Sequence, residues 1–300
     1  MSSGAAPTVA VVSPGAMGSA VGDALSRGGA RVVATVSGRS ERTARLAARA
    51  ELELLPDLGS LVAVADVVLS IVPPEAAGSV ARDVATAVAT QSARPVLVEL
   101  NAIAPATALR IEAELASDGV EVVDGSISGP PPWRPGTTRF YISGPRAAEI
   151  AALPFEGVDA IVVGAGVGAA SAVKMSTASV YKGTSALLAH ALLAADANGV
   201  LEHVLDDLRA GAPELVSNVE RRLASAGSKS PRYVAEMREI AATQAAAGLT
   251  PSLFEAVAEV FLALSASELA RSAPEDLSRD ITLDDVLKGL RDKRRTNVGA

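Results

Sequence analysis

The sequence contains no cysteine, and this absence excludes disulfides, thiolate metal ligands and cysteine nucleophiles. Only two histidines occur, which are too few for a histidine-rich zinc site, and their apolar helical surroundings predict that His190 and His203 are packing residues. Aromatic residues make up 3% of the chain although 49% of it is hydrophobic, so its core must consist mainly of alanine, valine and leucine.

Long apolar runs are also missing. No stretch of about 18 or more apolar residues occurs, and the short tail before Thr8 lacks the pattern of a signal peptide. The formal net charge of −7 argues against nucleic acid and anionic membranes as partners. We therefore expect a soluble, cytoplasmic protein that acts on a small molecule and uses no metal.

Short apolar runs alternate with helical patterns through the first half of the chain. Runs such as 8–13 and 94–100 are typical of buried parallel strands. Further strands are predicted over 31–36, within 62–72, and over 120–123, 138–143 and 160–163. The alternation predicts right-handed βαβ crossovers and a Rossmann-type, doubly wound α/β sheet over residues 1–165.

The second half has helical patterns only. Helices are predicted over 200–210, 213–226, 231–248, 251–272 and 283–295, and several begin at proline and end at glycine. A glycine-rich stretch from Gly164 to Gly168 leads into about 30 residues of good helix formers. We predict an all-α C-terminal domain over residues 166–300, joined by a long inter-domain helix. Its alanine-rich faces predict a homodimer.

A glycine-containing turn lies between the first strand and the first helix. Gly15 and Gly18 keep two positions of the G-x-G-x-x-G pattern, whereas Ser13 replaces its first glycine. Such a turn lets backbone N–H groups approach a pyrophosphate at a helix N-terminus, although glycines can also serve helix–strand packing alone. Its place in a βαβ unit favours a cofactor site. The residues of this site are Ser13, Pro14, Gly15, Ala16, Met17 and Gly18.

The turn after the second strand bears on the choice of nicotinamide cofactor. NAD-binding proteins usually carry an acidic residue there for the ribose hydroxyls, but from the end of the second strand onward this chain has no carboxylate before Glu41. The turn offers instead Ser37, Gly38, Arg39 and Ser40. Hydroxyls and a guanidinium suit a 2′-phosphate, so the turn predicts NADP. The alternative is a polar turn with a solvent-facing arginine.

Lys174, Thr177 and Tyr181 are spaced at i, i+3 and i+7 along the predicted inter-domain helix, and they therefore lie along one face. A lysine among alanine, valine and methionine is either a catalytic ammonium or an ordinary surface lysine. The dinucleotide-binding pattern that precedes it favours the catalytic role.

Five motifs taken together resemble the β-hydroxyacid dehydrogenase family, which includes 6-phosphogluconate dehydrogenase and the imine reductases. They follow in the family's order over essentially the whole chain: Gly15 to Gly18, Val72 with Pro73, Asn101 to Pro105, Asp124 to Gly129, and Gly168 to Lys174. The second half looks most similar to a branch with a phosphogluconate-dehydrogenase-like helical domain. The resemblance implies an NADP-dependent oxidoreductase that transfers hydride between the nicotinamide and a hydroxyl or carbonyl carbon of a small acid.

The resemblance also implies roles for individual residues. Lys174 matches a catalytic lysine that takes the hydroxyl proton as hydride leaves, and partial burial is expected to lower the pKa of Lys174 and ease this exchange. Ser128 and Gly129 match a loop that holds the substrate carboxylate. The cofactor riboses are expected beside Val72, Pro73, Pro74 and Asn101, catalysis at Lys174, Ser128 and Asn101, and substrate at Ser126, Ser128, Gly129, Trp133, Thr177 and Tyr181.

Two departures from the family pattern leave the substrate open. Ala178 stands where the family often has asparagine, so an orienting contact is lost unless Thr177 or Tyr181 replaces it. A proline run with Trp133 follows Gly129, and this tryptophan either reshapes the pocket mouth or anchors the loop on the helical domain. The alternative functions are reduction of a C=N bond and NADP binding without catalysis.

Overall fold

The computed structural model describes residues 6–91 and 93–291. The chain divides into two compact units, Met1–Met175 and Ser176–Ala300. This division falls inside a long helix, C-terminal to the boundary expected between residues 165 and 166, and the limits of the domains stay a prediction.

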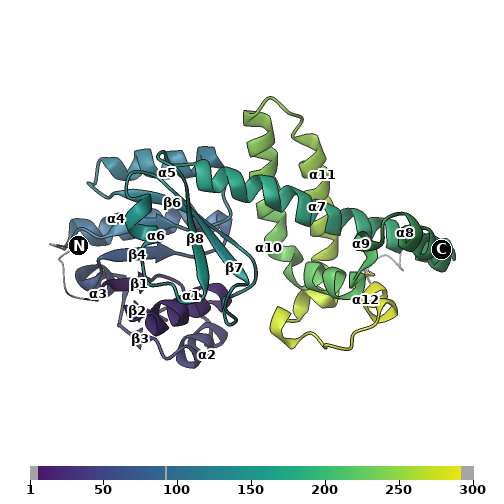
Figure 1. Cartoon of the computed structure of the whole chain (residues 1–300), viewed down its shortest axis with the longest axis horizontal. Helices are drawn as coiled ribbons and strands as arrows, with labels where there is room; N and C mark the ends of the chain where they lie inside the picture. The colour runs from purple at the N-terminus through teal and green to yellow at the C-terminus, as the bar shows by residue number, and fades with distance from the viewer. Residues whose placement is uncertain (1–5, 92, 292–300) are drawn as a thin grey trace. The chain divides into compact units, whose positions relative to one another are not determined.

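Within the described residues, the first unit forms an eight-stranded sheet in the order β3-β2-β1-β4-β5-β6-β7-β8 (Figure 1). The strands are β1 (Thr8–Val11), β2 (Arg31–Ala34), β3 (Glu53–Leu54), β4 (Val67–Ser70), β5 (Val96–Glu99), β6 (Val122–Ser128), β7 (Thr138–Ser143) and β8 (Val158–Gly164). The pair β6–β7 is antiparallel, and the other neighbouring strands are parallel. The order 3-2-1-4-5-6 is that of a Rossmann sheet, which confirms the predicted fold class.

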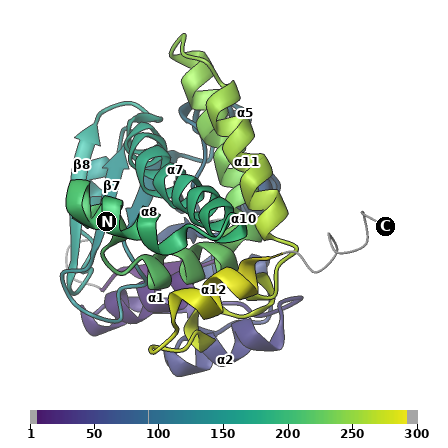
Figure 2. The same cartoon turned by 90° about the vertical axis from the view of Figure 1, so that its right-hand side faces the viewer.

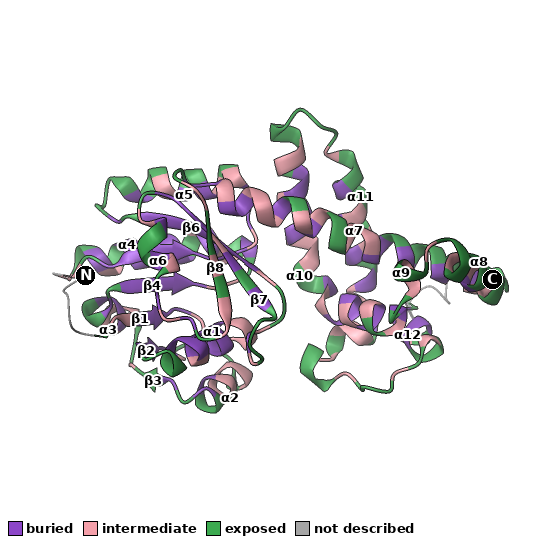
Figure 3. Cartoon of the chain, in the orientation of Figure 1, coloured by how far each residue is buried: buried purple, intermediate pink, exposed green. Residues whose placement is uncertain are grey.

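Helices cover both faces of this sheet. One face carries α1 (Ala16–Arg27), α2 (Glu41–Arg49) and α6 (Ala147–Ala151); the other carries α3 (Leu58–Val64), α4 (Ala77–Ala89), preceded by the turn η1 (Pro74–Ala76), and α5 (Pro105–Ala116). Successive strand residues alternate between two cores: Val9 and Val11 face the first, and Ala10 and Val12 the second. Figure 3 shows how completely the central strands are buried.

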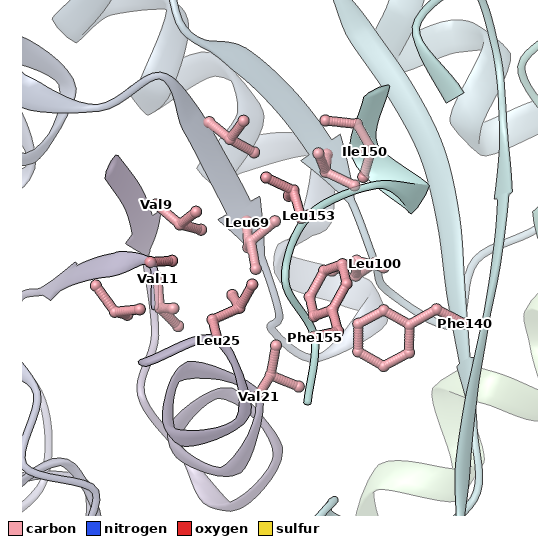
Figure 4. Close-up of a cluster of buried hydrophobic side chains, with 14 of the residues drawn as sticks. Val9, Val11, Val21, Leu25, Leu69, Leu100, Phe140, Ile150, Leu153 and Phe155 are labelled. Carbon is pink, nitrogen blue, oxygen red and sulfur yellow. The ribbon is translucent and has the colours of Figure 1, made fainter. Parts of the chain in front are cut away.

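The first core contains one of the few aromatic pairs of the chain. Phe140 and Phe155 meet edge to face with their ring centroids 5.0 Å apart (Figure 4). Around them lie small and medium aliphatic side chains such as Val21 and Leu25 from α1. The core is therefore aliphatic, as the composition requires.

The described elements of the second unit are all helical. They are most of α7 (Ala169–Ala197), then α8 (Leu201–Gly211), α9 (Pro213–Val216), α10 (Val219–Ala246), α11 (Ser252–Leu264), the turns η2 (Leu269–Arg271) and η3 (Pro274–Asp276), and α12 (Leu283–Leu290). Helices α10 and α11 lie side by side as an antiparallel pair (Figures 1 and 2). The all-helical C-terminal region and the long inter-domain helix α7 agree with the predicted architecture.

One predicted helix boundary is wrong. The helices expected over 213–226 and 231–248 are instead the short α9 and a single α10 that runs through Pro231. Proline lacks the N–H that would bond to the carbonyl of Gly227, four residues earlier. The hydroxyl of Ser230 donates to that carbonyl at 2.7 Å, which offsets the loss.

Two further differences concern the end of one helix and the exposure of the two histidines. Helix α11 ends at Leu264, well before residue 272. Residues 292–295 of the last predicted helix lie outside the described residues. His190 and His203 are exposed rather than packed, and His203 lies one turn from the exposed carboxylates Asp206 and Asp207. None of the described helices combines the length and the apolar character that are needed to cross a membrane.

Candidate functional site

The expected site residues of the first unit lie where parallel strands end. Strands β2, β1, β4, β5 and β6 run in one direction, so their carboxyl ends share one edge of the sheet. Residues 37–40, 13–18 and 72–74 follow β2, β1 and β4; Asn101 follows β5, and Ser128 ends β6. The chain order reverses between β1 and β4, which is where Rossmann sheets bind dinucleotides.

The turn after β1 leaves the N-terminus of α1 open. Gly15 is the N-cap residue, no side chain caps the helix, and its first turn contains no acidic residue. A Cβ atom on Gly15 would meet nothing within 4 Å, whereas one on Gly18 would lie 2.3 Å from the carbonyl oxygen of Ser13. Gly18 therefore permits close packing of α1 on the turn, and Gly15 leaves space beside the helix N-terminus. This arrangement fits a bound pyrophosphate.

The other residues of this turn hold it in place. The hydroxyl of Ser19 donates to the carbonyl of Pro14 at 2.6 Å. The Met17 side chain packs against the first core. Pro14 and Gly18 are buried, while Ser13, Gly15, Ala16 and Met17 are half-buried.

The turn after β2 presents polar groups to solvent. Ser37, Gly38, Arg39 and Ser40 are all exposed. Gly38 has a φ of +68°, and the Arg39 N–H donates to the carbonyl of Val36 at 3.0 Å, which closes the turn. The Ser40 hydroxyl accepts from the Thr43 N–H at 3.3 Å and so caps α2. Glu41 is the first acidic residue after β2, and its carboxylate lies 3.9 Å from the guanidinium of Arg45.

Asn101 ties the end of β5 to the loop after β4. Its Oδ1 accepts from the Val72 N–H at 2.6 Å, and its Nδ2 donates to the Ser70 hydroxyl at 3.0 Å. Its side chain is only 3% exposed. In that loop Val72 is half-buried, Pro73 is exposed and Pro74 is buried. Through these two hydrogen bonds Asn101 fixes the loop after β4. Its expected role in catalysis stays a prediction.

Helix α7 brings Lys174 to the end of β6. The Lys174 Nζ donates to the carbonyl of Ile127 at 2.6 Å, next to the half-buried Ser128. Ser126 is 1% exposed, and its hydroxyl donates to the carbonyl of Ala170 at 2.9 Å. Ser126 thus joins β6 to α7 in this structure, and its contact with substrate stays a prediction.

The loop after β6 begins at Gly129, which has a φ of +114°. The Thr138 hydroxyl donates to the carbonyl of Pro130 at 2.6 Å and closes the loop. Trp133 packs against the first core, and the guanidinium carbon of Arg49 lies 4.7 Å from its ring centroid. Trp133 is therefore anchored on α2 within the first unit, and its expected place at the mouth of the substrate pocket stays a prediction.

Thr177 and Tyr181 lie further along α7, in the second unit. Thr177 is half-buried, and Tyr181 is 70% exposed. Ala178, at the family's asparagine position, is buried. The continuous helix keeps both polar residues on the face that carries Lys174, and their contacts with substrate stay predictions.

The sequence reasoning gave no role to two buried carboxyl groups beneath this edge, Glu99 and Asp124, both 0% exposed. Burial raises the pKa of Glu99 to about 8; hydrogen bonds from Asn101 and Ser70 oppose the rise, and Asp124 adds to it. The sequence feature that could have predicted both is a single acidic residue within an apolar run that forms a strand. Among the described residues, no group of three histidine, aspartate or glutamate side chains is suited to hold a metal ion.

Comparison with known proteins identifies the two parts of the chain. Residues 8–154 match the NAD binding domain of 6-phosphogluconate dehydrogenase, and residues 195–264 match a domain of unknown function. The chain thus combines an NAD-binding domain of the 6-phosphogluconate dehydrogenase type with this C-terminal domain, in agreement with the predicted resemblance to the β-hydroxyacid dehydrogenase family. The first unit is therefore an NAD(P)-binding domain.

Two similar proteins are described without an activity of their own. An uncharacterized 28.5 kDa protein of Methanothermus fervidus is 29% identical over 173 residues; the match covers 58% of this chain and 65% of the relative, so the chain spans less than two thirds of its length. A solved conserved protein of unknown function, described as structurally similar to 3-hydroxyacid dehydrogenases, is 27% identical with a TM-score of 0.63, covering 86% of this chain and 96% of that one.

Two enzymes share the fold at lower identity. The 3-hydroxyisobutyrate dehydrogenase of Mycobacterium tuberculosis has a TM-score of 0.68 at 20% identity, covering 96% of this chain and all of that one (100%). An imine reductase of Streptomyces aurantiacus has a TM-score of 0.51 at 21% identity, covering 89% and 97%. Solved structures with this fold thus include a 3-hydroxyisobutyrate dehydrogenase and an imine reductase.

Proposed function

We propose that this protein is an NADP-dependent oxidoreductase that interconverts a hydroxyl and a carbonyl group on a small acid. The observation that carries the proposal is the position of Lys174, whose Nζ lies 2.6 Å from the Ile127 carbonyl at the end of β6. This is the sheet edge at which the N-terminus of α1 is open. An ammonium group, a cofactor loop and the hydroxyl of Ser128 thus belong to one edge.

Each part of this edge has a chemical task. The N–H groups at the start of α1 bind the pyrophosphate, and the Ser128 hydroxyl with the Gly129 N–H binds the substrate carboxylate. The Ile127 carbonyl orients Lys174 Nζ, which accepts the proton of the substrate hydroxyl on oxidation and returns it on reduction. When bound, the nicotinamide supplies the acceptor or donor of the hydride.

A panel of substrates tests the reaction class. We expect NADP-dependent oxidation of small 3-hydroxy acids, measured by the absorbance of the reduced nicotinamide. A second candidate, reduction of a C=N bond, is favoured by the exposed Tyr181 on the Lys174 helix. Turnover of cyclic imines with NADPH, and of no hydroxy acid, would favour this second function. Tight NADPH binding without any turnover would instead indicate a binding protein.

The turn after β2 supports NADP over NAD, because its exposed groups are hydroxyls and the guanidinium of Arg39. Arg39→Ala is expected to weaken NADPH binding about 10- to 100-fold, since a hydrogen bond to a charged group contributes roughly 1.5–3 kcal/mol. NADH binding should change little, because NADH lacks the 2′-phosphate. Titrations that follow Trp133 emission, and energy transfer to the reduced nicotinamide, measure both affinities.

Arg45→Ala is the matched control, because Arg45 is also exposed but lies on α2 beyond the turn. It should leave both affinities unchanged. Unaltered NADPH affinity in Arg39→Ala, or stronger binding of NADH than of NADPH by the unmodified protein, would contradict the assignment of NADP.

We also infer that the protein is a homodimer joined through α7. Val180 and Leu187 are 64% and 70% exposed, and their i, i+7 spacing places them on one helix face. Leu187→Glu is expected to convert the dimer into a monomer in light scattering, because a charge would be desolvated at the interface. Leu109→Glu, at a 48% exposed leucine of α5 in the first unit, should remain dimeric. A monomeric unmodified protein would overturn the inference.

A further inference from the structure

A row of buried polar side chains crosses four strands beneath the candidate site. Ser70 of β4, Glu99 of β5, Asp124 of β6 and Ser143 of β7 are register partners in succession. All four are 0% exposed. Side chains in register on neighbouring strands point to the same face of a sheet. The row therefore places two carboxyl groups side by side in the interior.

Asp124 holds the start of the helix that carries the catalytic lysine. Its Oδ2 accepts from the N–H groups of Gly168 and Ser171 at 2.9 and 3.0 Å and from the Ser143 hydroxyl at 3.0 Å. Its Oδ1 accepts from the Ser171 hydroxyl at 2.6 Å, and the Ser143 hydroxyl accepts in turn from the Ala170 N–H at 3.0 Å. Three of the four donors to Asp124 come from the start of α7, where the helix dipole is positive, and the fourth comes from β7.

Glu99 has the opposite surroundings. Its Oε1 accepts from the Asn101 N–H at 3.1 Å, while its Oε2 is buried without a hydrogen-bond partner in the described part of the chain. Burial is also the main cause that raises its pKa to about 8. An ionised Glu99 would leave an oxygen unsolvated beside the negative Asp124, so the neutral acid is the favoured form.

In the described part of the chain, no basic side chain is among the groups that shift the pKa of Glu99. Helices α4 and α5 turn alanine, valine, isoleucine and leucine towards the sheet. On α7, the half-buried Lys174 bonds to the Ile127 carbonyl, and Ser171 bonds to Asp124. The charged residues of α4 and α5 are not buried: Arg82, Asp83, Arg110, Glu112 and Glu114. Two adjacent buried carboxyl groups without a counter-ion do not both ionise.

We propose that Glu99 and Asp124 carry one proton between them, held on Glu99, and that this row positions both sides of the catalytic site. The neutral Glu99 holds Asn101, which holds the loop after β4 through Val72. The ionised Asp124 holds the start of α7, from which Lys174 reaches Ile127. Glu99 is thus a positioning residue. The positioning role of the row rests on the proposed function. The assignment of the proton to Glu99 does not depend on it.

The first test compares Glu99→Gln with the unmodified protein across pH. The folded pKa of Glu99 is raised from 4.5 to about 8, so the unfolded chain releases this proton at lower pH than the folded chain does. The free energy of unfolding of the unmodified protein therefore falls as the pH rises from about 4.5 to about 8. Glutamine does not titrate, so Glu99→Gln lacks this contribution. The melting temperature of Glu99→Gln, relative to the unmodified protein, should rise with pH up to about pH 8 and then level off. A difference that is constant with pH would overturn the proposal.

The matched variant Asp124→Asn and infrared spectroscopy locate the proton directly. In Asp124→Asn, the side-chain NH2 group would face the N–H and hydroxyl donors that now bond to the Asp124 carboxylate. The melting temperature of Asp124→Asn should therefore be lower than that of Glu99→Gln at every pH. The unmodified protein should show the carbonyl stretch of a buried, protonated carboxylic acid, which Glu99→Gln lacks. Loss of this band in Asp124→Asn, with its retention in Glu99→Gln, would place the proton on Asp124 and overturn the proposal.

Rescue by the conservative variant tests the positioning role. Glu99→Leu removes the acceptor for the Asn101 N–H, so its NADPH dissociation constant should rise about tenfold, while Glu99→Gln binds as the unmodified protein does. Equal affinities in both variants would remove the link from Glu99 to the cofactor loop. If Glu99→Leu does not fold, the pH series and the infrared band still decide where the proton lies. Failure of the unmodified protein to bind NADPH would overturn the proposed function and leave those two measurements valid.

Discussion

Replacement of Lys174 by alanine is expected to lower kcat about 100- to 10,000-fold, the range of general acid–base catalysis. Its Nζ lies 2.6 Å from the carbonyl of Ile127, beside the Ser128 proposed to hold the substrate, and alanine leaves no group to move the hydroxyl proton. NADPH affinity should stay nearly the same, because the turns after β1 and β2 supply the proposed cofactor contacts. Steady-state rates with the best hydroxy acid and titration by Trp133 emission measure the two effects.

Lys174→Arg is the informative companion of this variant. Arginine keeps the positive charge but does not release a proton near neutral pH. If Lys174 transfers the proton, Lys174→Arg should lose nearly as much activity as Lys174→Ala. A nearly normal rate in Lys174→Arg would mean that the charge alone matters. Loss of NADPH binding in Lys174→Ala would place this lysine in the cofactor site.

The fold was predictable from the sequence wherever hydrophobic periodicity was strong. The apolar runs that became β1, β4 and β5 and the pattern of α7 are long enough to distinguish strands from helices. The two-residue β3 has no period of its own and forms only by pairing with β2. Proline is a helix breaker by local rules, and only the hydroxyl of Ser230, which bonds to Gly227, shows why α10 continues through Pro231.

The site was predictable only in part, because spacing along the chain does not give partners across the sheet. The residues expected at strand ends lie at one edge since parallel strands end together. The buried row was not foreseen, because Ser70, Glu99 and Asp124 become neighbours only when β4, β5 and β6 pair. The anchoring of Trp133 by Arg49 is equally a tertiary contact, between the loop after β6 and the end of α2.

Gly129→Ala is expected to destabilise the protein by about 2–5 kcal/mol, the sum of backbone strain and overpacking. The φ of Gly129 is +114°, a conformation that residues with a side chain rarely adopt. An added Cβ would also lie 2.3 Å from the carbonyl oxygen of Thr137, which is backbone and has little freedom to move. The melting temperature should fall by several degrees, measured by circular dichroism.

Gly136→Ala is the matched control, because Gly136 lies in the same loop with a φ of +74° and an added Cβ would meet nothing within 4 Å. Gly136→Ala should lose only about 1–2 kcal/mol of folding stability, the cost of placing a residue with a Cβ atom in a left-handed conformation. Equal losses of stability in the two variants would show that the close approach to Thr137 is not what requires glycine at position 129.

The two glycine variants also separate substrate binding from cofactor binding. Relief of the contact with Thr137 moves residue 129 away from β7, and with it the adjacent Ser128 and the N–H group proposed to hold the substrate carboxylate. Gly129→Ala should therefore raise KM for the hydroxy acid more than it raises the NADPH dissociation constant, because the loops after β1 and β2 are not displaced. Gly136→Ala should change neither. A parallel loss of both affinities in Gly129→Ala would mean that the loop supports the whole sheet edge rather than the substrate carboxylate alone.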